Sequence, residues 1–249
     1  MTRPNRRMSH FQCDIQYIPI MVHRTVPLDK PVVLGINSVY HESSACVVRG
    51  NEVLAFAEEE RFNRRKHAKP ADMETVDQIP ELAMTDCMAR AGITCEEIDY
   101  VAASFDPSLR RPPIPEPVTE GSWGHPVGER QFQEKLALIP GAVSEFMARD
   151  ISASWVWVPH EIAHAASAYY RSPFDEAAIL CMDGIGEDST SLLAYGTGSA
   201  LNPLSYTSYP DSLGFVWEKL SKFTGMDEYS APKLMALAAF ASPTPIANI

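Results

Sequence analysis

The sequence has few cysteines and no long apolar run, and each shortage excludes a class of protein. Its five cysteines show no C-x-x-C spacing and are odd in number, which fits a reduced compartment better than a disulfide framework. No apolar run approaches the roughly 20 residues that a membrane-spanning helix needs. Residues 1–30 begin with basic side chains but lack the continuous apolar segment of a secretory signal, so we treat them as an unassigned extension. We therefore expect a cytoplasmic protein that is not embedded in a membrane.

Positive charge is also scarce. The chain has 21 Lys and Arg against 32 Asp and Glu, a net charge of −11, which argues against general binding to nucleic acid or to an anionic membrane. With 249 residues, 45% of them hydrophobic, it can bury a sizeable core and fits a globular protein of one or two domains. A small anionic substrate would need a local cluster of basic side chains.

The densest chemistry lies between residues 155 and 198. His160 and His164 are four residues apart, and the Ala-rich run that follows favours a helix, so both imidazoles should lie on one helix face. The apolar strand predicted at 177–182 then delivers Asp183 into a glycine-spaced turn. Two imidazoles and a carboxylate form a mixed N/O donor set for a divalent metal. In that turn, Gly184 and Gly186 would let backbone amides approach an anion such as a phosphate.

Less specific interpretations of these residues exist. A histidine pair at this spacing is more often surface or capping polarity, and Asp-Gly after a strand is often a tight turn. Their occurrence in one short helix–strand unit favours a site. The segment 160–164 also matches H-E-x-x-H, in which Glu161 would be the general base of a zinc peptidase, but this alternative explains only five residues.

The order of apolar runs and helical patterns predicts an α/β fold. A pattern of strand, polar turn, strand and glycine occurs twice, roughly 145 residues apart, which suggests a duplicated architecture closing on a ligand. A Pro-rich loop or lid is expected at 106–128. The strands are predicted at 32–36, 44–48, 53–57, 100–105, 155–158, 177–182, 189–195 and 203–207, and the helices at 80–91, 129–149 (broken at Pro140-Gly141), 212–224 and 232–241.

Two earlier polar segments complete the candidate site. His41 lies in a polar loop between the first two predicted strands. Three glutamates at 58–60 are followed by a cluster of bases that could be a solvated face; in the functional interpretation, Arg64 and Lys66 supply the positive charge that an anionic substrate needs.

Taken together, three blocks of sequence resemble the O-carbamoyltransferases of the nodulation-protein and cephamycin-biosynthesis type. The blocks are VLGIN with HESSA (33–45), AEEERF with RKH (57–67), and HEIAHAASA with SPF and MDGIGE (160–187). A looser match joins SLG (212–214) to KLMALA (233–238), so the resemblance runs in order from about residue 32 to 240. It implies an actin-like, sugar-kinase-like duplicated α/β fold with mixed sheets and flanking helices. Residues 31–176 would form its first half and residues 177–249 the start of an incomplete second half.

The resemblance also implies an activity. In that family the amino-terminal domain transfers a carbamoyl group from carbamoyladenylate to a hydroxyl of a small-molecule acceptor, and a separate domain makes this donor from ATP and carbamoyl phosphate. Nothing in this sequence resembles that second domain. The alternative is a non-catalytic fragment that binds metal or nucleotide, which is favoured by Pro232 standing where the family usually has glycine.

Site roles follow from the matching positions. His160, His164 and Asp183 would bind a divalent metal, iron by preference, with a further acidic ligand expected beyond Ile249. His41 would act beside the acceptor hydroxyl as general base or as orienter of the carbamoyl group. Lys66, assisted by Arg64, would contact oxygens of the donor. The expected partners are the hydroxyl acceptor and a second copy in a homodimer, with neither nucleic acid nor membrane.

Overall fold

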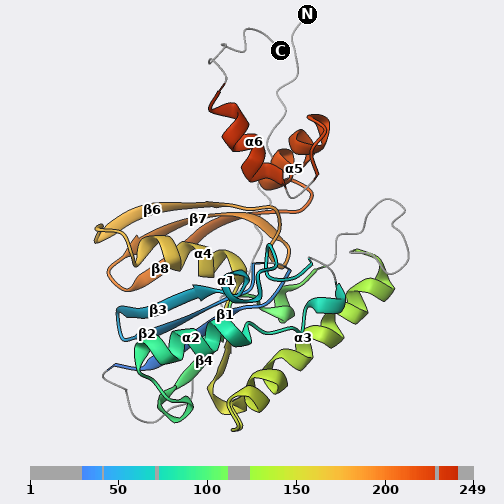
Figure 1. Ribbon diagram of the computed structural model, residues 1–249. Helices are drawn as coiled ribbons and strands as arrows, with labels where there is room; N and C mark the ends of the chain where they lie inside the picture. Colours follow the sequence, from blue (N-terminus) through green and yellow to red (C-terminus); the bar gives the residue numbers. More distant parts are fainter. Residues whose placement is uncertain (1–29, 41, 71–72, 112–123, 228–229, 241–249) are drawn as a thin grey trace, which may run out of the picture.

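A computed structural model describes residues 30–40, 42–70, 73–111, 124–227 and 230–240, and it contains two β-sheets with flanking helices (Figure 1). The first sheet has five strands in the order β3-β2-β1-β4-β5, and the second has three in the order β6-β7-β8. No helix of the described segments is long and apolar enough to cross a membrane. The mixed α/β class is therefore confirmed.

The first sheet combines an antiparallel meander with two parallel strands. β1 (Val32–Asn37), β2 (Ser44–Arg49) and β3 (Glu52–Glu58) pair antiparallel, whereas β4 (Tyr100–Ala103) runs parallel to β1, and β5 (Trp155–Trp157) runs parallel to β4. Alternate residues of β1 are buried, as expected for a strand with one face on the core. After β3 come the short α1 (Glu60–Asn63) and α2 (Glu81–Ala91), which packs on β2 and β3.

Helix α3 (Pro126–Phe146) corrects one prediction, because it is continuous where a break was expected at Pro140-Gly141. A proline inside a helix removes one hydrogen bond at a cost of about 3 kcal/mol. Four fully buried side chains on one face of α3 offset that loss by packing into the main core, namely Phe132, Leu136, Ile139 and Val143. The helix also begins inside the predicted Pro-rich loop, of which residues 112–123 lie outside the described segments.

The second sheet repeats the antiparallel meander of the first. It consists of β6 (Glu176–Met182), β7 (Ser189–Thr197) and β8 (Ala200–Ser208). Helix α4 (His160–Tyr169) packs on the face that looks toward the first sheet in Figure 1. The opposite face exposes a row of apolar side chains, Leu180, Met182, Leu193 and Tyr195. Helices α5 (Leu213–Phe223) and α6 (Ala231–Ala238) follow β8 and contact each other.

Candidate metal centre

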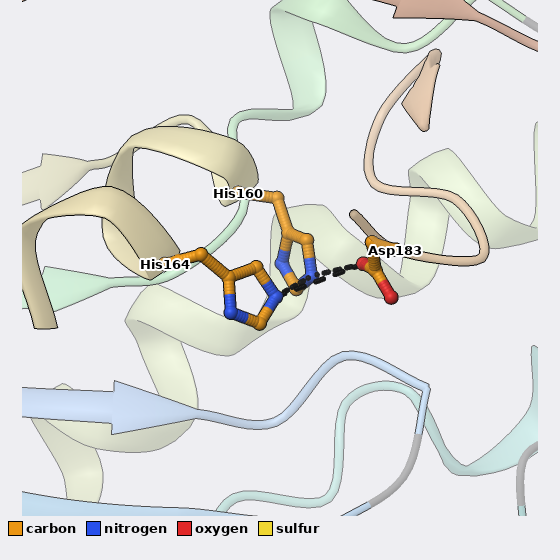
Figure 2. Close-up of side chains that lie close together, drawn as sticks. All are labelled: His160, His164 and Asp183. Atoms are coloured by element: carbon orange, nitrogen blue, oxygen red, sulfur yellow. Dashed lines mark hydrogen bonds and ion pairs between the residues drawn. The ribbon is translucent and has the colours of Figure 1, made fainter. Parts of the chain in front are cut away.

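Helix α4 and the end of β6 bring three ligand-type side chains together (Figure 2). His160 and His164 lie on successive turns of α4, and Asp183 follows directly after β6. His160 Nε2 lies 3.0 Å from Asp183 Oδ2 and 3.0 Å from His164 Nε2, while His164 Nε2 lies 3.6 Å from Asp183 Oδ2. The structure thus joins the three residues that the sequence predicted as metal ligands.

The spacing of these donor atoms fits the ligands of one ion. One ligand atom from each residue lies within 4.8 Å of the other two. Nitrogen and oxygen ligands bind zinc-like ions at about 2.0–2.2 Å, so adjacent ligands of one ion should lie about 3.0–3.6 Å apart. The observed separations of 3.0, 3.0 and 3.6 Å fall in that range. Two imidazoles and one carboxylate also form the donor set of non-haem Fe(II) sites.

The imidazole of His160 is held at both nitrogens. Its Nδ1 lies 3.0 Å from the carbonyl oxygen of Ser104, which can only accept, so Nδ1 carries a proton and Nε2 is the atom left for a metal. Burial alone would lower the pKa of His160, but the hydrogen bond and negative charge of Asp183 outweigh it and raise the pKa to about 9. Without a metal, His160 is therefore an imidazolium at neutral pH.

The pKa of Asp183 is shifted in the opposite direction from that of His160. Burial would raise the pKa of Asp183, yet hydrogen bonds from His160 and His164 and the adjacent positive charge hold the pKa of that carboxyl far below its usual range. The carboxylate is thus ionised and ready to bind a cation. One side of the donor set opens to solvent, because the side chain of His164 is half exposed. A bound ion would therefore keep positions free for other ligands.

The backbone amides of the turn after β6 are used in hydrogen bonds to nearby residues. The amide of Gly184 donates to Asp183 Oδ1 at 2.7 Å, and the amide of Gly186 donates to the carbonyl of Ser189 at 2.8 Å. A Cβ at Gly186 would lie 2.9 Å from Cβ of His160, so glycine allows the turn to pack directly on the ligand helix. An anion at this turn would compete with acceptors that already use both amides.

Helix α5 begins against the same turn. Its N-cap, Ser212, accepts from the amide of Phe215, and its hydroxyl lies 2.7 Å from the carbonyl oxygen of Gly184. The amide of Gly214 donates to the carbonyl of Asp183 at 3.1 Å. A Cβ at Gly214 would lie 2.4 Å from backbone atoms of Asp183, which leaves no space for any side chain.

A buried polar network behind the ligands was missed by sequence reasoning. The guanidinium of Arg110 binds both carboxylate oxygens of Glu129, at 3.1 and 2.8 Å, and donates to the carbonyl of Glu187 at 2.9 Å. The Tyr40 hydroxyl donates to the carbonyl of Gly186 at 3.2 Å. These contacts attach the turn after β6 to the first half of the chain. The acceptors on the turn itself are backbone carbonyls, so the sequence offers no direct signal for them.

Glu161 is placed unfavourably for a peptidase base. Its side chain is 1% exposed, and neither carboxylate oxygen forms a hydrogen bond with another described residue. Burial, followed by the negative charge of Asp183, raises the pKa of Glu161 to about 7. A zinc-peptidase base must reach the water on the metal, whereas this carboxyl is buried. The H-E-x-x-H alternative therefore has no support from the geometry.

The basic cluster after α1 lies at the surface. Arg64, at the C-terminal end of α1, and Lys66, in the next turn, are exposed, and no hydrogen bond or ion pair links either side chain to another described residue. Lys69 is instead buried, with Nζ donating to the carbonyls of Ser38, Thr75 and Gln78. His41 lies outside the described residues. The roles of His41, Arg64 and Lys66 stay predictions.

The sequence matches a known family along most of its length. The model of the carbamoyltransferase N-terminus matches residues 32–111 and 116–248, so the chain belongs to the carbamoyltransferase N-terminal family. This match includes all three candidate ligands and both glycines of the turn after β6. It confirms the family to which the three sequence blocks pointed.

The individual relatives that the chain matches are longer proteins. Protein sll1178 of Synechocystis sp. is 34% identical over 226 residues, which cover 85% of this chain and 35% of that protein. Nodulation protein NolNO of Sinorhizobium fredii is 28% identical over 214 residues, covering 84% of this chain and 29% of that protein. The chain thus spans about a third of the length of these relatives. Among solved structures, YeaZ from Pseudomonas aeruginosa is similar at 12% identity with a TM-score of 0.38, covering 72% of this chain and 68% of that chain.

Proposed function

We propose that this chain forms the metal-binding part of an O-carbamoyltransferase site, which transfers a carbamoyl group from carbamoyladenylate to a hydroxyl of a small molecule. The observation that supports it is the convergence of His160, His164 and Asp183 within 4.8 Å, in a chain of the carbamoyltransferase N-terminal family. Residues 31–176 and 177–249 would be the first half and the beginning of the second half of one duplicated domain. The ion would sit at the seam between them.

The donor atoms fit a divalent ion, and the His₂-carboxylate set favours iron. When bound, such an ion would supply a Lewis acid that grips the nucleotide portion of the donor and polarises its carbonyl. The chain's own residues would do the rest. Asp183 is ionised before an ion arrives, and Ser104 holds the Nδ1 proton of His160 so that Nε2 faces the ion. Gly184 and Gly186 would line the nucleotide side of the site.

The carbamoyl transfer itself would use residues from the first half. His41 would take the proton from the acceptor hydroxyl or orient the carbamoyl carbonyl. Lys66, with Arg64, would neutralise donor oxygens; both are exposed and free to meet a ligand from solvent. A separate domain would make carbamoyladenylate from ATP and carbamoyl phosphate.

The test supplies the full 249-residue chain with Fe(II) under anaerobic conditions and then with synthetic carbamoyladenylate and a panel of small polyhydroxylated acceptors. We expect a carbamoylated product by mass spectrometry that disappears with a chelator, with Asp183→Asn, and with His41→Ala. ATP and carbamoyl phosphate in place of the adenylate should give no product. Product that forms equally in the Asp183→Asn variant, or robust transfer from ATP and carbamoyl phosphate by this chain alone, would contradict the proposal.

The second candidate is a fragment that binds metal or nucleotide without transferring a carbamoyl group. Pro232, in the first turn of α6, favours it, since proline has no backbone N–H to donate to a nucleotide. It predicts one equivalent of bound Fe(II) by elemental analysis, lost in Asp183→Asn, with no product from carbamoyladenylate. The same experiment therefore separates the two.

A further inference from the structure

Glu187 is the buried acid that ends the Asp-Gly-Ile-Gly-Glu turn after β6. It is 3% exposed. Its carboxylate accepts hydrogen bonds from two backbone amides of distant segments: Oε1 lies 2.7 Å from the amide nitrogen of Asp106 and 2.9 Å from that of His160. One carboxylate thus connects the end of the first sheet with the start of the ligand helix.

These two amides belong to the segments that orient the His160 ring. His160 itself is the first residue of α4, and its Nδ1 is held by the carbonyl of Ser104, two residues before Asp106. The relative position of these segments therefore sets the direction of His160 Nε2. The N-cap of α4, Pro159, makes no side-chain capping bond, so Glu187 is the group that satisfies the amide at the helix start.

The main chain of Glu187 is fixed as well. Its carbonyl accepts from Arg110, and the side chains of Arg110 and Glu129, both nearly inaccessible, hold each other in a bidentate pair. Four residues earlier in the same turn is Asp183. Arg110 thus fixes the position of Glu187. The carboxylate of Glu187 in turn holds the backbone of His160, and its own backbone continues the turn that carries Asp183.

We propose that Glu187 is a positioning residue of the metal centre, whose carboxylate locks the start of α4 to the loop after β4 so that His160 Nε2 points at the ion. The proposal rests on the proposed metal site but not on carbamoyl transfer. Groups that orient a ligating histidine usually change metal affinity by about 10–100-fold when removed. Glu187 would differ from the usual case because it holds the backbone of the ligand rather than its ring.

The chain offers a matched control. Glu59 is also buried and reaches from another element to a helix start, where its carboxylate accepts from the amide of Ala83 at 2.8 Å. The N-cap of α2, Pro80, likewise makes no side-chain capping bond. Glu59→Ala therefore removes the same kind of contact from a helix that carries no candidate metal ligand.

The experiment titrates the full chain with Co(II), as a spectroscopic probe for the site, and compares wild type, Glu187→Ala and Glu59→Ala. We expect Glu187→Ala, which has no acceptor for the two amides, to bind Co(II) about 10–100-fold more weakly and, at saturation, to show altered visible ligand-field bands because His160 is misdirected. Glu59→Ala should lower the melting temperature but keep the wild-type affinity and spectrum. Wild-type affinity and spectrum in Glu187→Ala would overturn the inference, as would an equal loss of affinity in Glu59→Ala.

Glu187→Asp distinguishes position from charge and serves if Glu187→Ala does not fold. Aspartate keeps the negative charge near the ion but is too short to reach both amides. We expect the same weakening as for alanine, whereas full affinity in Glu187→Asp would show that only the charge matters and would overturn the inference. Failure of the wild-type chain to bind Co(II) at all would instead overturn the proposed metal site.

Discussion

The two sheets differ in how they are covered. The first sheet packs against α2 and α3 around a large buried core, whereas the buried cluster of the second contains five side chains, Ala165, Tyr169, Ile179, Leu192 and Ala194. The candidate metal ligands lie on helix α4 and at the end of β6, which share this smaller cluster. The difference shows that the candidate ligands have little core of their own, and that contacts from the well-packed first sheet and its loops fix their positions through Ser104, Asp106 and Arg110.

The largest effect should come from the core of the first half. Leu136→Ala removes a fully buried side chain of α3 and should lower the free energy of unfolding by about 2–5 kcal/mol. Leu180→Ala, on the exposed face of the second sheet, should change it by no more than about 0.5 kcal/mol. Urea unfolding of both variants measures the contrast. Similar losses in the two would show that the exposed face is covered in solution.

Removing a ligand should weaken metal binding and also lower the stability of the metal-free chain. Asp183→Asn takes away the charged donor and should weaken Fe(II) or Co(II) binding by about 100-fold or more, since even groups behind the ligands change affinity by about 10–100-fold. Without metal, Asp183 pairs with His160 at 3.0 Å and raises its pKa to about 9, so loss of this pair should lower the urea concentration at which the chain unfolds. Metal affinity equal to wild type would exclude Asp183 as a ligand.

The pH dependence of metal binding follows from the charged state of His160. An ion must displace the Nε2 proton, and the pKa of His160 is raised to about 9 by Asp183. Apparent affinity should therefore increase about tenfold per pH unit up to about pH 9 and level off above it. In Asp183→Asn the affinity should level off at a lower pH, because the charge that raises the pKa of His160 is gone. A plateau that begins near pH 6.5 would mean that Asp183 does not hold the proton.

The smallest expected effect concerns Glu161. Its pKa of about 7 in the folded chain exceeds the ordinary value of 4.5, so the fold favours the protonated form. That contribution is fully present below about pH 4.5 and is lost as pH rises toward 7, by at most about 1 kcal/mol per pH unit. Glu161→Gln should flatten the decline of metal-free stability in this window. Chemical unfolding at pH 5, 6 and 7 measures it, and an unchanged slope would contradict the assignment.

The sequence predicted that His160, His164 and Asp183 would converge because its signals are local. Histidines four apart on a helix must share a face, and a strand that ends in aspartate places it at a sheet edge; the structure joins all three. The continuity of α3 was mispredicted, because proline has a local cost while the burial of Leu136 and Ile139 depends on the tertiary fold. Glu187 was missed for a related reason: its partners are backbone amides of Asp106 and His160, and every residue except proline offers the same amide.

Gly214 lets the start of α5 lie directly against the turn after β6, which carries Asp183. Because the helix backbone rests on the backbone of Asp183 with no side chain between them, no rotamer can absorb a displacement there. Any shift of the start of α5 must therefore carry the backbone of Asp183 with it, so the position of that carboxylate depends on where the helix lies.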